Sequence, residues 1–283
     1  MATMPVVACV DGSEESLRAA EWAAQEALRH GAPLRIVSAV AMPPRMHAYD
    51  IAPRAGADEL CGESARALSE AAARSGEVSS RLVIDARILI GLPALAVADS
   101  GSGALMLVVG ARGAGGFGAM LLGSVSRYAA MHASCPVIVV REGACTAHLE
   151  VVVGIHDLQD TSAILEFAFE EADLRGATLV AVHSWNGLTA ATWHPADPAQ
   201  FAVEADRNLA EALGPWRAKY PAVPVRQDVV QGHPARVLTS YSSRADLVVI
   251  SRHGRGAGSA VGGIQHALLS HARGPVVIVP SSG

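Results

Sequence analysis

The chain has 283 residues, of which 51% are hydrophobic and 17% charged, and its formal net charge is −5. This composition excludes intrinsic disorder, which needs low hydrophobicity and high charge. The mild acidity argues against a sequence-independent nucleic-acid binder, because that function needs a basic surface. We therefore expect a folded protein of two domains and no nucleic-acid partner.

The sequence also carries no sign of export or of a membrane span. The longest apolar runs, such as residues 103–111, are far shorter than the roughly 20 residues that cross a bilayer. The first residues lack the basic and apolar regions of a secretory signal. The chain contains four cysteines and no C-x-x-C pair, so we expect reduced thiols in a cytoplasmic protein without a membrane partner.

Short apolar runs alternate with helical patterns along the first half. In chain order we expect a strand at 5–10, a helix that is capped by Ser13 or Ser16 and ends at Gly31, a strand at 34–40, a helix at 58–74, a strand at 82–88, a helix at 92–99, a strand at 105–109, a helix at 123–132 and a strand at 137–141. Uniformly apolar strands that alternate with helices predict an α/β fold, in which helices cover both faces of a parallel sheet.

The second half repeats this pattern. Residues 7–11 align with 152–156, residues 91–94 with 232–235, and residues 136–140 with 275–279, at offsets of 145, 141 and 139. The strands are expected at 151–155, 178–183, 223–230, 247–250 and 276–279, and the helices at 160–175, 198–220, 235–243 and 265–272. The chain is therefore expected to contain two homologous domains, at residues 1–143 and 150–281.

Ligands of open parallel sheets bind beyond the carboxyl ends of the strands, so the exits of the first and fourth strands are the places to inspect. The first strand leads into Asp11-Gly12-Ser13. The fourth leads into a glycine-rich loop that begins at Gly110 and Gly113 and ends in Gly123-Ser124-Val125-Ser126, where a helix begins. Glycines let a ligand approach the main chain, and the N-terminus of a helix suits a phosphate group.

The pattern Gly-x2-Gly-x9-Gly-Ser after a strand, the Val-Asp-Gly-Ser segment at residues 10–13 and the duplication resemble the universal stress proteins, in the tandem-domain form of actinobacteria. The resemblance covers nearly the whole chain. It implies two five-stranded parallel sheets of order 3-2-1-4-5, similar to the adenine nucleotide alpha hydrolases. It also implies an ATP site, with or without Mg²⁺, across the ends of strands one and four.

Carried over to this sequence, the resemblance assigns Asp11 to the adenosine and the main chain of Ala39 to the adenine. The ribose and phosphates would lie against Gly110, Arg112 and Gly113, and the phosphates would be held by Gly123, Ser124, Val125 and Ser126. Arg127 is a candidate phosphate neighbour by charge alone, and a solvated arginine on the helix is at least an equal expectation. Cys9 stands where the family more often has glycine, and its thiol would narrow the pocket.

The second half departs from the motif. His156 aligns with Asp11 and Ser251 with Gly110, and the segment Gly263-Ile264-Gln265-His266 replaces Gly-Ser-Val-Ser. We therefore expect nucleotide binding there to be weak or absent. The fifth strands would be sheet edges, so we expect either a homodimer or an intrachain pseudo-dimer.

The leading hypothesis is an ATP-dependent stress sensor or regulator. The sequence contains no P-loop and no Gly-x-Ser-x-Gly elbow, and no general base is visible near the phosphate loop, so no catalytic residue is assigned. The eleven histidines show no zinc-ligand spacing, so no metal site is assigned. Three alternatives remain open: a cyclic AMP-binding protein, a slow ATPase, and a scaffold with vestigial sites.

Overall fold

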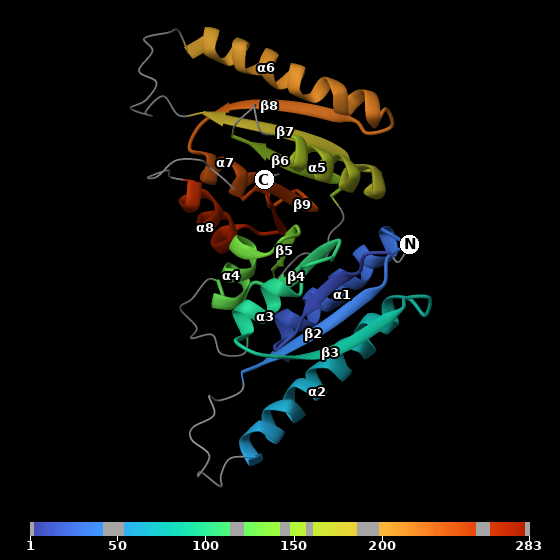
Figure 1. Cartoon of the computed structure of the whole chain (residues 1–283). Helices are drawn as coiled ribbons and strands as arrows, with labels where there is room; N and C mark the ends of the chain where they lie inside the picture. Colours follow the sequence, from blue (N-terminus) through green and yellow to red (C-terminus); the bar gives the residue numbers. More distant parts are fainter. Residues whose placement is uncertain are drawn as a thin grey trace. The chain divides into compact units, whose positions relative to one another are not determined.

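The computed structural model describes residues 3–41, 54–113, 122–141, 148–156, 161–185, 198–252 and 261–280. The chain divides into two compact units, residues 1–141 and 142–283. Each unit is an α/β domain with a parallel sheet, which confirms the predicted fold class (Figure 1). Among the described helices, none combines the length and the apolar composition of a membrane span.

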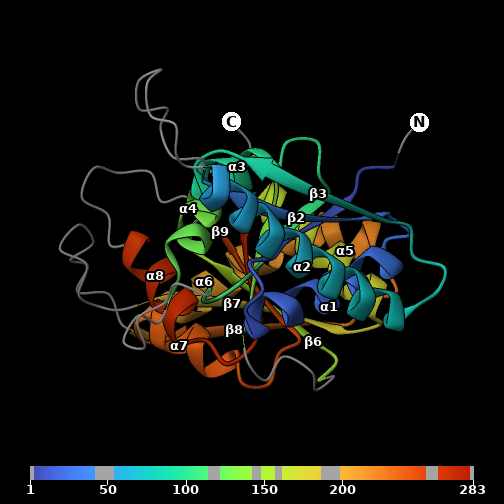
Figure 2. The same ribbon diagram turned by 90° about the horizontal axis from the view of Figure 1, so that it is seen from below.

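The first unit contains β1 (Val6–Cys9), α1 (Glu14–Arg29), β2 (Leu34–Val40), α2 (Arg54–Val78), β3 (Ile84–Ile90), α3 (Pro93–Asp99), β4 (Met106–Gly110), α4 (Ser124–His132) and β5 (Val137–Val140). Its strand order is β3-β2-β1-β4-β5, as the resemblance implied. Helix α1 packs against α2, and α3 against α4 (Figure 2). Strands β1 and β4 are neighbours in the middle of the sheet, so their carboxyl ends open side by side.

The second unit contains β6 (Glu150–Ile155), α5 (Ser162–Arg175), β7 (Thr178–Trp185), α6 (Pro198–Lys219), β8 (Val225–Gln231), α7 (Pro234–Tyr241), β9 (Leu247–Ser251), α8 (Val261–His271) and β10 (Val276–Val279). Its strand order is β8-β7-β6-β9-β10. When the strands of each unit are numbered from one to five, this is the order 3-2-1-4-5 of the first unit. The two halves of the sequence therefore fold alike.

The start of α1 shows how local sequence sets the first strand exit. Gly12 has φ +84°, a backbone conformation that side chains disfavour, and it turns the chain from β1 into the helix. Of the two candidate caps, Ser13 is the one used, because its hydroxyl accepts a hydrogen bond from the Ser16 amide at 3.3 Å. The helix then buries an alanine-rich face on the sheet.

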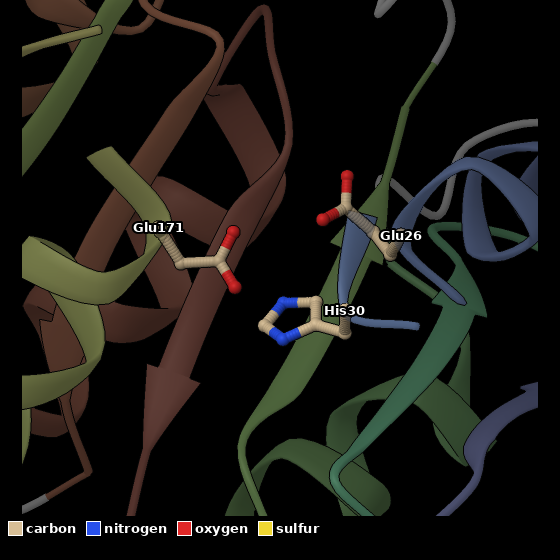
Figure 3. A group of neighbouring side chains, drawn as sticks. All are labelled: Glu26, His30 and Glu171. Carbon is tan, nitrogen blue, oxygen red and sulfur yellow. The ribbon is translucent and has the colours of Figure 1, made fainter. Parts of the chain in front are cut away.

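Both repeats place a buried glutamate at the same position of their first helix. Glu26 on α1 pairs with Arg29, and Glu171 on α5 pairs with Arg175. The two glutamates are 145 positions apart, the offset that aligns the first elements of the repeats. Figure 3 shows both carboxylates, together with His30 at the C-terminal end of α1. The shared position is structural evidence for the duplication.

The structure shifts several predicted boundaries. Strand β3 spans Ile84–Ile90 rather than 82–88, because it pairs residue by residue with the seven residues of β2. Helix α2 extends from Arg54 to Val78, beyond the predicted 58–74. Helix α8 begins at Val261 instead of 265; its first turn contains Gly262 and Gly263, whose low helix propensity hides the start.

Candidate functional site

A cavity of about 280 Å³ opens at the carboxyl ends of β1 and β4, where the strand order reverses. Its volume lies near the lower end of the range of about 300–1,000 Å³ that is usual for small-molecule sites. Fifteen residues from five segments line it: Cys9, Val10, Asp11, Ser16, Ala39, Pro93, Val97, Val109, Gly110, Arg112, Gly113, Gly123, Ser124, Val125 and Ser126.

All nine residues that the sequence assigned to nucleotide binding lie in this lining. They come from the ends of β1, β2 and β4 and from the start of α4, so the fold brings together positions up to 115 residues apart in the chain. Arg127, which was considered by charge alone, is exposed and does not line the cavity. The contact of each lining residue with a ligand stays a prediction.

The first strand exit presents a carboxylate that is held by local hydrogen bonds. Asp11 Oδ1 accepts hydrogen bonds from the Ser13 amide at 3.0 Å and from the Ser13 hydroxyl at 2.6 Å. The Asp11 amide donates to the Ser16 hydroxyl oxygen at 3.2 Å. These bonds hold the acidic side chain at the cavity, where it can accept hydrogen bonds from the hydroxyl groups of a ligand.

Two glycines of the loop leave space for neighbouring groups that a side chain would meet. A Cβ on Gly113 would lie 2.2 Å from Asp11 Oδ2, so the absence of a side chain there makes room for the carboxylate. A Cβ on Gly110 would lie 3.1 Å from the backbone carbonyl of Glu15, on α1. Gly110 therefore allows β4 to approach the helix, in addition to any space that it leaves for a ligand.

The start of α4 forms the donor-rich end of the cavity. Gly123 is the N-cap residue, and its amide donates to the Ala111 carbonyl at 2.7 Å. The first N–H groups of a helix have no acceptor within the helix, and the helix dipole makes this end favourable for anions. The Ser126 hydroxyl, whose contact with a phosphate stays a prediction, donates to the Gly110 carbonyl at 2.6 Å. It therefore fixes the loop, while Ser124 is exposed beside the amides.

Part of the cavity lining is apolar. It includes the Cys9 thiol and the side chains of Ala39, Val97 and Val109. Burial, and secondarily the charge of Asp11, raises the pKa of the Cys9 thiol to about 12. The thiol is therefore uncharged at physiological pH. Pro93 and Val97 were not predicted as lining residues. Their spacing of four on α3, which puts both on one helix face, is a signal that could have identified them.

The second unit has a much smaller cavity at the matching place. Its volume is about 40 Å³. The side chain of Leu238 lies against Gly154, and the Gln265 amide group donates to the Ser251 carbonyl at 2.9 Å and to the Arg252 carbonyl. Gln265 and Ser126 thus make equivalent hydrogen bonds, each to the main-chain carbonyl at the end of the preceding strand. In the alignment of the two segments, Ser126 corresponds to His266, so Gln265 stands one position earlier. His156, which replaces Asp11, lies at the rim.

These observations define the chain as a duplicated, doubly wound α/β protein with a glycine-lined cavity at the switch point of its first sheet. The model of the universal stress protein family matches residues 3–141 and 149–280. The chain belongs to this family.

Relatives of nearly the same length support the assignment. The chain is 32% identical to universal stress protein Rv2005c of Mycobacterium tuberculosis, over 98% of this chain and 97% of that one. It is 34% identical to a universal stress protein of Mycolicibacterium smegmatis, over 95% of each chain. The crystal structure of a universal stress protein from Archaeoglobus fulgidus shares the fold, with a TM-score of 0.72 and 18% identity over 98% and 96% of the two chains.

Proposed function

We propose that the first unit binds an adenine nucleotide, with ATP as the principal ligand, and that the protein acts in the cytoplasm as a nucleotide-dependent stress sensor or regulator. The observation that carries this proposal is that one cavity has both apolar and hydrogen-bonding residues in its lining. The apolar lining, from Cys9, Ala39 and Val109, suits a purine ring. The lining at Gly113 and the start of α4 supplies amides and a helix N-terminus for phosphates.

The residues present also fit the two polar parts of such a ligand. The Asp11 carboxylate lines the cavity and can accept hydrogen bonds from ribose hydroxyls, because an ionised carboxylate offers several acceptor positions. When Mg²⁺ accompanies ATP, the Asp11 carboxylate would be its candidate protein ligand, because it is the acidic group among the described lining residues. The ion would supply charge neutralisation of the phosphates.

Binding without rapid turnover is the expected behaviour. Arg112 is the cationic residue among the described lining residues, and its guanidinium group is paired with Glu15. The donors around the phosphate end are mainly backbone amides, which hold charge but do not transfer protons. A slow ATPase is the competing possibility, and phosphate release above about 1 s⁻¹ under multiple turnover would favour it.

The second unit is proposed to keep the fold without an adenine nucleotide site. Its cavity of about 40 Å³ is too small for a purine, and Leu238 and Gln265 occupy the space. Gln265 is 3% exposed and is bonded to main-chain carbonyls, so its side chain has a structural role that a ligand would have to disrupt.

The proposal is tested by mass spectrometry of small molecules released from the purified, denatured protein, together with thermal shifts on adding ligand. We expect released ATP, or a shift with ATP that increases with its concentration, as mass action requires. Release of cyclic AMP, or a shift with cyclic AMP alone, would assign the cavity to that ligand. A protein that releases no nucleotide and shows no shift would support the scaffold alternative.

A further inference from the structure

Arg112, the cationic residue in the cavity lining, is bound by Glu15. Glu15 lies in the first turn of α1 and is not part of the lining. The Arg112 amide donates to Glu15 Oε2 at 2.8 Å, and Arg112 Nε donates to Glu15 Oε1 at 2.7 Å. A second guanidinium nitrogen, Nη2, also contacts Oε1. One carboxylate thus binds both the backbone and the side chain of a residue 97 positions away.

Glu15 is itself firmly placed. Its side chain is only 13% exposed, against 45% for Arg112. Its backbone carbonyl lies so close to Gly110 that a Cβ there would approach it to 3.1 Å. The carboxylate therefore projects from a fixed point on α1, whereas the residue that it holds belongs to a loop. Charge-assisted hydrogen bonds of this kind are stronger than neutral ones.

A second arginine makes the arrangement electrostatically dependent on Glu15. Arg141, after β5, is half-buried, and burial lowers its pKa. The charge of Glu15 opposes this lowering, whereas the charge of Arg112 adds to it. Glu15 is thus an anion that acts on both arginines, and its loss would leave the repulsion between their charges less compensated.

From this geometry we infer that Glu15 is a positioning residue for the nucleotide site: it holds Arg112, and with it the first turn of the glycine loop, in the orientation that receives phosphates. Glu15 does not touch the ligand and acts through Arg112. This inference rests on the proposed function of the first unit. Arg112 and Arg141 align with His253 and Pro280 of the second repeat, so the set of one acid and two arginines belongs to the repeat with the open cavity.

The test compares Glu15→Ala, Glu15→Gln and the control Glu14→Ala in the full chain. Glu14 also lies in the first turn of α1, but it pairs with Arg74 of α2, at 3.0 and 3.2 Å, and with none of the described residues of the loop, 110–113 and 122–123. Calorimetry measures the affinities for ATP and for adenosine, which has no phosphate. Hydrogen exchange of the Arg112 amide reports the order of the loop without any ligand.

We expect Glu15→Ala to weaken ATP binding about tenfold or more, to leave adenosine binding within about twofold, and to accelerate exchange at Arg112. Glu15→Gln keeps an acceptor for the Arg112 amide and should recover part of both effects, while Glu14→Ala should match the wild type. Equal losses for ATP and adenosine would show a merely structural role and overturn the inference. So would an unchanged or a higher affinity for ATP, the latter because it would mean that Glu15 repels phosphate.

The two proposals can fail separately. If the wild type binds ATP and Glu15→Ala leaves exchange at Arg112 unchanged, the positioning role is refuted and the nucleotide site stands. If the wild type binds no ATP but exchange rises in Glu15→Ala alone, the proposed function fails, and Glu15 is still shown to order the loop.

Discussion

Replacing Gly113 with alanine is the sharpest perturbation of the cavity that leaves the fold in place. The new Cβ would lie 2.2 Å from Asp11 Oδ2, whereas ordinary van der Waals contact begins at 3.4 Å. The carboxylate must therefore retreat by about 1 Å. Because the obstacle is the end of an exposed, flexible side chain and not backbone, the retreat is cheap for the folded state.

The magnitudes follow from the bonds that Asp11 makes. A hydrogen bond that involves a charged group contributes about 1.5–3 kcal/mol when well formed, and displacement of the exposed Asp11 carboxylate should cost the folded state less than this. A retreat that takes the carboxylate away from the ligand, together with a methyl group in the cavity, should weaken ATP binding at least about tenfold, or 1.4 kcal/mol.

The assay is calorimetric titration with ATP, combined with thermal unfolding of each variant. Gly76→Ala on α2 is the matched control, because a Cβ there meets nothing within 4 Å. We expect Gly113→Ala to lose affinity while its Tm stays within a few degrees of the wild type, and Gly76→Ala to keep its affinity. Wild-type affinity in Gly113→Ala would refute the assignment of Asp11 and Gly113 to the ligand site.

Three further predictions concern stability. Gly110→Ala places a methyl group 3.1 Å from the backbone of Glu15, so we expect a loss of about 1–3 kcal/mol in the free energy of unfolding, measured by denaturant titration; an unchanged free energy would show that the helix can shift. The pKa of Cys9 is raised to about 12, so the thiol keeps its proton in the folded state at pH values where it loses it in the unfolded state. The free energy of unfolding should therefore fall between pH 9 and about 12. This fall with pH should be less steep in Cys9→Ala, and an equally steep fall would contradict the raised pKa. Gln265→Ala leaves two main-chain carbonyls without their donor, so it should lower stability by about 1–3 kcal/mol without changing ATP affinity; a variant that gains a second ATP site would show that Gln265 only blocks the pocket.

The fold was largely predictable because its signals are local. The apolar runs at residues 34–40 and 276–279 coincide with β2 and β10. Boundaries set by tertiary pairing were less predictable: the ends of β3 follow from its register with β2, which no local pattern reveals.

The candidate site was predictable where a motif marks it. Asp11, Gly110, Gly113 and Gly123 carry the family pattern, and the structure places them around one cavity. The contribution of Glu15 was not visible, because its partner Arg112 lies 97 residues away and a charged residue in a first helical turn has an ordinary explanation. The hydrogen bond from the Ser126 hydroxyl to the Gly110 carbonyl was also not visible, because it joins residues 16 positions apart in the chain.

The number of nucleotides bound per chain tests the central claim most directly. Calorimetric titration of the intact chain with ATP should give one site, which Gly113→Ala weakens and Gln265→Ala leaves unchanged. Two equivalent sites would contradict the closed cavity of the second unit, and the absence of any site would contradict the open cavity of the first.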